Sequence, residues 1–193
     1  MTSLLPPSVP VSQLGRAAHD IGMAGLLGGT LFGRLALHPS VTEITDATER
    51  GKVINTAWRR YGLINSLSLA AVVGAWLPAR LDETSARNLS ERELRLARAK
   101  DVMVGAVAVT GLASMVEGIR FSRSAPGGAV PLHDGDHVTA SATPEQQRRK
   151  RRVNALGIAS LAADIGLAAT NAALAQESFR RPPARRLVSR LRK

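Results

Sequence analysis

Four long apolar stretches, separated by charged or glycine-rich connections, constrain the fold of this chain more than any other feature of its sequence. A membrane-spanning helix needs about 20 mostly apolar residues, and these stretches approach that length. We therefore expect four transmembrane helices, at approximately residues 17–37, 61–79, 102–119 and 153–176. The second stretch has no charged residue, so it is the strongest of the four.

The composition favours helices that pack in lipid. Apolar residues make up 45% of the 193 residues, but aromatic residues only 3%. Small apolar residues allow helices to approach closely in a bilayer. The formal net charge of +11 favours an anionic neighbour such as phospholipid head groups. Because the chain has no cysteine, disulfides and thiolate metal sites are excluded.

The predicted fold class is all-α, a four-transmembrane-helix bundle in a single membrane domain over residues 1–193. Residues 122–143 predict a flexible loop, because Gly, Ser, Pro, Thr and Asp dominate them, and residues 177–193 predict a basic tail. Ser68-Leu69-Ala70-Ala71 and Ser160-Leu161-Ala162-Ala163 stand at the same offset after an Arg pair. This match indicates two tandem helical hairpins, although two Ala/Leu-rich helices can also match by chance.

Three glycines stand at fourth-residue spacing in the first apolar stretch, namely Gly25, Gly29 and Gly33. This spacing places them on one helix face, where another helix can approach closely. We interpret them as helix-packing positions. Their neighbour is either another helix of the same chain, or a partner subunit, a flat pigment or a lipid.

Four ionisable residues lie in or beside the predicted spans, and we single them out as intramembrane polar positions: Asp164, Glu117, His19 and Asp20. Asp164 is the most informative, because a carboxyl group at mid-bilayer faces a partner or a water-filled cavity. A structural hydrogen bond and a proton or cation relay both fit it. Glu117 could pair with Arg34 or with Arg120. His19 and His38 are too far apart along one helix to share a metal ion.

A run of five basic residues precedes the fourth stretch: Arg148, Arg149, Lys150, Arg151 and Arg152. Such clusters bind anionic lipid head groups, and that is our interpretation of the run. They also bind phosphate backbones, but no aromatic residues interleave with this run to stack on bases. We therefore do not expect nucleic acid as a partner.

No catalytic motif stands in the sequence. We find no GxSxG, GxxxxGK[ST] or HExxH motif, and no dinucleotide-binding fingerprint after a predicted strand. We predict no catalytic residue, no metal ligand and no cofactor.

One segment resembles known families. Gly28-Gly29 with Phe32, His38-Pro39, Arg50-Gly51-Lys52-Val53 and Arg59-Arg60-Tyr61-Gly62 are similar to motifs of small bacterial four-helix membrane families of unknown function. The segment also faintly resembles copper-resistance D-type and anthrone-oxygenase-like membrane proteins. The resemblance covers about the first 75 residues, implies a four-helix membrane fold and carries over no functional residue.

These patterns predict a multi-pass protein of the cell membrane, with both termini cytoplasmic. The leading function is an accessory, scaffold or assembly subunit that contacts anionic lipid and other membrane subunits, or a second copy of itself. Three alternatives remain open: a small transporter or proton-relay protein using Asp164, a membrane-bound oxygenase or metal-dependent enzyme using His19 and Asp20, and a soluble basic helical protein that binds nucleic acid.

Overall fold

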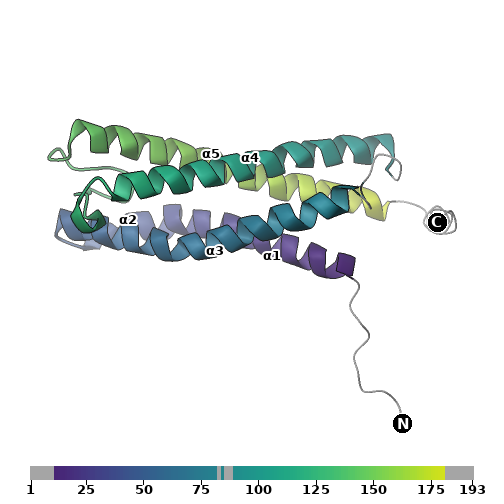
Figure 1. Ribbon diagram of the computed structural model, residues 1–193, viewed down its shortest axis with the longest axis horizontal. Helices are drawn as coiled ribbons and strands as arrows, with labels where there is room; N and C mark the ends of the chain where they lie inside the picture. The colour runs from purple at the N-terminus through teal and green to yellow at the C-terminus, as the bar shows by residue number, and fades with distance from the viewer. Residues whose placement is uncertain (1–10, 82–83, 85–88, 181–193) are drawn as a thin grey trace, which may run out of the picture.

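Four long helices make up most of the computed structural model, which describes residues 11–81, 84 and 89–180. They are α1 (Val11–Phe32), α3 (Ala47–Leu81), α4 (Glu91–Ser122) and α5 (Pro144–Phe179). Figure 1 shows them running lengthwise through an elongated molecule, with α1 along α3 and α4 along α5. The all-α fold class is confirmed for the described residues.

The two ends of the molecule differ. The beginning of α1, the end of α3, the beginning of α4 and the end of α5 lie at one end, which we call the terminal end (Figure 1). The opposite end holds the short helix α2 (His38–Ser40) and residues 123–143. We call residues 123–143 the cap and this end the cap end. Both ends of the described helical region thus lie on the same side of the molecule.

Local sequence signals explain where two of the long helices begin. The Ser90 hydroxyl accepts from the Glu93 N–H, and the Glu93 carboxylate accepts from the Ser90 N–H at 2.9 Å, which forms a capping box at the start of α4. Thr143 and Gln146 form the same arrangement at the start of α5. These reciprocal bonds satisfy backbone N–H groups that a helix start otherwise leaves without partners.

The first long helix continues past α1 through a wider turn. A π-helix, η1 (Gly33–Leu37), is followed by α2 and by the 3-10 helix η2 (Val41–Glu43). Pro39 stands just after the π-helix. Because proline has no N–H and its ring clashes with a carbonyl one turn earlier, it disturbs a regular α-helix, and such disturbances are relieved by π-turns.

The main apolar core lies between the long helices. Its buried members come from all four: Leu26, Val72, Trp76, Ala97, Val104, Val107, Ala163, Leu167 and Leu174. A second, smaller core lies at the cap end, where Leu132 packs with Val41 and Ile54.

The cap is packed on the helices, in contrast to the flexible loop that its composition predicts. Val130 and Leu132 are fully buried, and the Leu132 N–H donates to the carbonyl of Ala47 at 2.9 Å. A side chain at Gly51 would collide with the Val130 backbone. Because Gly51 of α3 has no side chain, the backbone of the cap can lie directly against α3 at this position.

Three helices, α3, α4 and α5, are long and apolar enough to cross a membrane. They contain the predicted spans 61–79, 102–119 and 153–176 and extend beyond them at both ends. Only 17% of each apolar stretch is buried inside the protein. The helix that contains most of the predicted span 17–37, α1, is not among the three; Arg16, His19 and Asp20 lie in its first half.

Candidate functional site

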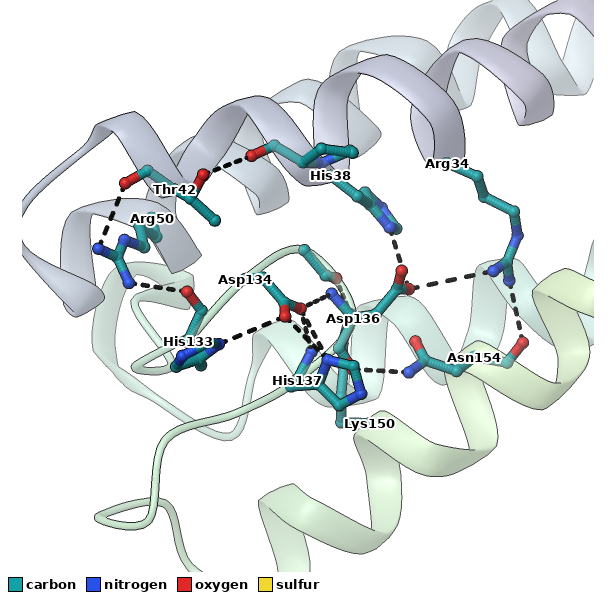
Figure 2. Close-up of polar contacts among 12 residues, drawn as sticks. Arg34, His38, Thr42, Arg50, His133, Asp134, Asp136, His137, Lys150 and Asn154 are labelled. Atoms are coloured by element: carbon teal, nitrogen blue, oxygen red, sulfur yellow. Dashed lines mark hydrogen bonds and ion pairs between the residues drawn. The ribbon is translucent and has the colours of Figure 1, made fainter.

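A polar cluster at the cap end joins α3 and the cap to the end of the first long helix (Figure 2). The Trp58 indole N–H donates to Nε2 of His38 at 3.1 Å, and Nδ1 of His38 lies 3.0 Å from the Asp136 carboxylate. Because an indole nitrogen can only donate, Nε2 accepts and Nδ1 carries the proton. Burial, together with the charge of Lys150, lowers the pKa of His38, in agreement with a neutral imidazole.

Arg34 extends this cluster to α5. Its guanidinium donates to the backbone carbonyl of Asn154 at 3.0 Å and lies 4.0 Å from the Asp136 carboxylate. The Asn154 amide in turn donates to the backbone carbonyl of Asp136 at 2.7 Å. Figure 2 shows Asp136 held between His38 and Arg34. Arg34 therefore pairs with the cap and not with Glu117.

Lys150 reaches into the same cluster from α5. It is 4% exposed, and its ammonium donates to the Gly135 carbonyl at 2.5 Å. The ammonium also lies 5.7 Å from the centre of the Phe121 ring. Burial lowers the pKa of Lys150 to about 8. Lys150 thus fixes the cap to α5 and does not point to the surface with the other basic residues of its run.

The turn His133-Asp134-Gly135-Asp136-His137 shapes this part of the cap. The Asp134 carboxylate accepts from the N–H groups of Asp136 and His137 at 2.7 and 2.8 Å. Burial by itself raises the pKa of Asp134, but hydrogen bonds from the His137 ring and from these N–H groups outweigh it and lower the pKa to about 2. Arg50 donates to the His133 carbonyl at 2.7 Å and to the Ile44 carbonyl at 2.6 Å. The turn is thereby tied to the residues before α3.

A second polar cluster lies at the terminal end. The ammonium of Lys100, on α4, donates to the Asn171 side-chain oxygen at 2.6 Å and lies 4.1 Å from the centre of the Trp76 ring. The His19 ring is 6.5 Å from the same Trp76 ring. Nδ1 of His19 lies 3.4 Å from the Asp20 carboxylate, which also accepts from Asn171 at 3.3 Å. Residues from all four long helices therefore meet here.

These residues line a cavity of about 1190 Å³. Its walls are mainly small or apolar side chains of α3 and α5, and its polar lining includes His19, Lys100 and Asn171. His19 is 4% exposed, and its Nε2 has no hydrogen-bond partner among the described residues. A buried nitrogen without a partner is costly, so this atom is a candidate contact for a ligand.

The Trp76 N–H does not bond to His19. It donates to the Asp101 carboxylate at 2.9 Å, and the Arg80 guanidinium binds the same carboxylate at 2.9 Å. This ion pair joins the end of α3 to α4. The histidine–tryptophan hydrogen bond of the cap end therefore has no counterpart at the terminal end.

Asp164 lies between the two clusters, inside the helices. It is 5% exposed, and its Oδ1 has no hydrogen-bond partner among the described residues. The Thr30 hydroxyl interacts with its carboxyl group; this hydroxyl also donates to the Leu26 carbonyl at 2.9 Å. Asn171 lies seven residues further along α5, about 10 Å away along the helix axis at 1.5 Å per residue.

The three predicted helix-packing glycines all face α3. A side chain at Gly25 would meet Ser68, one at Gly29 would meet Tyr61, and one at Gly33 would meet Trp58. The Tyr61 hydroxyl donates to the Gly25 carbonyl at 2.5 Å. The described neighbour of this glycine face is therefore another helix of the same chain.

Glu117 pairs with the two arginines nearest to it. Its carboxylate lies 2.8 Å from Arg120 and 3.9 Å from Arg149, and Arg149 also pairs with Glu145 at 2.8 Å. The other members of the basic run, Arg148, Arg151 and Arg152, are exposed. The run therefore divides into an exposed arginine surface and the buried Lys150. The predicted basic tail lies outside the described residues from 181 onward.

Among the described residues, no group of three His, Asp or Glu side chains could hold a metal ion. The candidate site residues that the sequence did not predict are Lys100, Asn171, Asp136 and the two tryptophans. Comparison with protein-family models, curated protein sequences and solved structures finds no match to this chain. Fold and site thus define an all-helical protein with three candidate membrane spans and two buried polar clusters.

Proposed function

We propose that this chain is a multi-pass protein of the cell membrane in which α1, α3, α4 and α5 all cross the bilayer as one bundle. We further propose that it acts without catalysis, as an accessory or scaffold subunit that binds lipid and other membrane subunits. Because the beginning of α1 and the end of α5 lie at the same end of the molecule, both termini belong on one side. The Arg-rich tail favours the cytoplasmic side.

The observation that carries this proposal is the apolar outer surface of the helices. Large apolar side chains on every long helix or its continuation are more than half exposed: Ile21, Leu35, Leu63, Leu67, Val102, Val109, Ile158 and Ile165. Exposed apolar surface of this extent marks a membrane or protein contact. Lipid chains or neighbouring transmembrane helices would cover it.

The spacing of the polar clusters supports the same proposal. On α5, Lys150 in the cap-end cluster and Asn171 in the terminal-end cluster are separated by about 32 Å at 1.5 Å per residue. The hydrocarbon core of a bilayer is about 30 Å thick. The clusters would therefore lie near the two membrane interfaces. The first long helix, from His19 in α1 to His38 in α2, joins the two clusters and would span the same depth.

Extraction and crosslinking test the two parts of the proposal. Alkaline carbonate should leave the full chain in the membrane pellet, whereas release into the supernatant would contradict the membrane assignment. For the scaffold role, a photo-crosslinking residue should replace Leu67 or Ile165, which are exposed, with buried Val72 as the matched control. We expect the same discrete protein adduct from both outer positions and none from position 72. Adducts with lipid alone would contradict the scaffold role.

The buried Asp164 favours a second candidate function, a proton or cation relay. Its Oδ1 is buried between the helices and has no hydrogen-bond partner among the described residues, and a carboxyl group at such a position normally serves a pathway or a structural hydrogen bond. Asp164→Asn should abolish proton flux in vesicles if the relay exists and leave the crosslinked complex intact. Proton flux equal to that of the unmodified chain would remove this candidate.

A further inference from the structure

The two polar clusters are built from the same set of residue types. Each has a histidine from the first long helix beside a tryptophan from α3, with ring centres 5.7 Å apart for His38–Trp58 and 6.5 Å apart for His19–Trp76. Each also has a buried lysine, which is Lys150 at the cap end and Lys100 at the terminal end. The clusters differ in what faces these groups.

At the cap end, the protein fills the site with its own chain. The Gly135 carbonyl accepts from Lys150, and the Asp136 carboxylate accepts from His38. These two oxygen groups belong to adjacent residues of the cap. Since the Trp58 N–H also donates to Nε2 of His38, the described structure gives a partner to both ring nitrogens of this histidine and to the ammonium of this lysine.

At the terminal end, Asp20 lies beside Nδ1 of His19 and Asn171 accepts from Lys100, but no described group donates to Nε2 of His19. Lys100 has an amide oxygen as its hydrogen-bond partner; among the described residues, the carboxylates of Asp20 and Asp101 favour its charge without forming an ion pair with it. A buried ammonium without a paired anion is unfavourable. His19 is 4% exposed, and its Nε2, near the Trp76 ring, has no partner among the described residues. Both residues line the cavity of about 1190 Å³.

The residues that line the cavity indicate the polarity and the charge of a ligand that could bind there. Small and apolar side chains dominate them, including Ala71, Gly74 and Ala75 of α3 and Leu174 of α5. The occupant therefore has an apolar part beside its polar head. The charged lining consists of Arg16 and Lys100 and of the carboxylates of Asp20 and Glu93. Because the cations do not outnumber the carboxylates, a head group with more than one negative charge is disfavoured.

We propose that the terminal-end cavity binds a single-chain amphiphile with a carboxyl head group, of the long-chain fatty acid class. The carbonyl oxygen of the head accepts from Lys100, and its O–H donates to Nε2 of His19. If the proton moves from that oxygen to Nε2, a carboxylate is left between an imidazolium and an ammonium. The alkyl chain lies along the walls of α3 and α5. This proposal does not depend on the scaffold role.

Binding of radiolabelled dodecanoate to the full chain in nanodiscs of zwitterionic lipid tests the proposal, with protein-free nanodiscs as background. We expect saturable binding of one dodecanoate per chain. Unlabelled dodecanol, which lacks the carboxyl group, and dodecyl phosphate, which carries a larger and more highly charged head, should each compete at least tenfold less well. No saturable binding, or equal competition by either compound, would overturn the assignment.

Two variants with matched controls locate the site. Lys100→Gln should weaken dodecanoate binding at least tenfold, whereas Arg98→Gln removes an exposed charge from the same helix and should leave binding unchanged. Gly74→Leu places a side chain in open space at the cavity wall, so the fold should tolerate it while dodecanoate is excluded. Gly62→Leu, also on α3 and also facing open space, is its control. Unaltered binding in both Lys100→Gln and Gly74→Leu would place the ligand elsewhere and contradict the proposal.

Discussion

The indole N–H of Trp58 donates to Nε2 of His38 at 3.1 Å, and this single bond fixes the protonation of the imidazole. Since Nε2 must accept, Nδ1 carries the proton, and the Nδ1–H group donates a hydrogen bond to the Asp136 carboxylate at 3.0 Å. Both ring nitrogens are thereby occupied. His38 acts as a structural link between α3 and the cap, whereas one nitrogen of His19, at the other end, has no partner among the described residues.

The neutral state of His38 predicts acid sensitivity of the cap end. Burial lowers the pKa of His38 below its ordinary value of 6.5. As the pH falls through 6.5, the unfolded chain binds a proton that the folded chain does not, so the stability falls. With Trp76→Phe, Trp58 is the remaining tryptophan and reports on this end. The thermal unfolding transition that Trp58 fluorescence reports should shift to lower temperature when the pH is lowered from 7.5 to 5.5. Adding His38→Gln to Trp76→Phe should reduce that shift. An equal shift with and without His38→Gln would contradict a neutral His38 as the source of the acid sensitivity.

The buried Lys150 should make the stability of the fold depend on pH in the alkaline range. Burial lowers its pKa from 10.5 to about 8. Below pH 8 the ammonium is charged in both states, whereas between pH 8 and 10.5 only the unfolded chain holds the extra proton, so the stability rises with pH. The gain is at most about 3 kcal/mol at 1.36 kcal/mol per pKa unit. Thermal unfolding of the full chain should show it, and the gain should be smaller in Lys150→Met. A gain of the same size in Lys150→Met would exclude Lys150 as its source.

Two adjacent glycines of α1 should respond differently to the same substitution. A Cβ at Gly29 would overlap the Tyr61 ring, whereas a Cβ at Gly28 meets nothing within 4 Å. We expect Gly29→Ala to lower the free energy of unfolding by about 1–3 kcal/mol through overpacking. Gly28→Ala should be neutral or raise it by up to about 1 kcal/mol. Equal effects in unfolding experiments would contradict the described packing of α1 on α3.

Gly135 should be necessary for docking of the cap. An added side chain would collide with His38, so Gly135→Ala should separate the turn from α2 and weaken the bond from Lys150 to the Gly135 carbonyl. Limited trypsin digestion should then cut faster after Arg123, which lies at the start of the cap. Gly118→Ala, on α4 with open space around it, is the control. Unchanged cleavage in Gly135→Ala would show that the cap tolerates a side chain there.

The sequence predicts the helical class well, because apolar periods and caps act locally. The candidate spans on α3, α4 and α5 follow from hydropathy, and the glycine face of the first long helix follows from the spacing of Gly25, Gly29 and Gly33. The packing of the cap does not follow, because it depends on contacts between residues far apart in the chain, such as Leu132 with Val41 and Gly135 with His38. Loop composition alone gives no sign of them.

The polar clusters carry a signal that a longer periodicity could have detected. On α4, Glu93, Lys100 and Phe121 stand at multiples of seven residues, and so do Ser178, Asn171 and Lys150 on α5. The structure pairs them in antiparallel order: Ser178 with Glu93 at 3.5 Å, Asn171 with Lys100 at 2.6 Å, and Lys150 with the Phe121 ring. A seven-residue period keeps two helices facing each other along the same seam. Considered one residue at a time, Lys100 and Asn171 are unremarkable polar positions.

The four-helix membrane assignment depends on α1 crossing the bilayer, and single-cysteine accessibility in sealed vesicles measures this crossing. The chain has no cysteine, so Gln13→Cys, Ala24→Cys and Ser40→Cys, all at exposed positions, each give one reactive site. With a membrane-impermeant maleimide, we predict that Gln13→Cys and Ser40→Cys react from opposite sides, one of them only after permeabilisation. Ala24→Cys should stay unreactive in both conditions. Reaction of positions 13 and 40 from the same side, or of position 24 without detergent, would contradict a membrane-spanning α1.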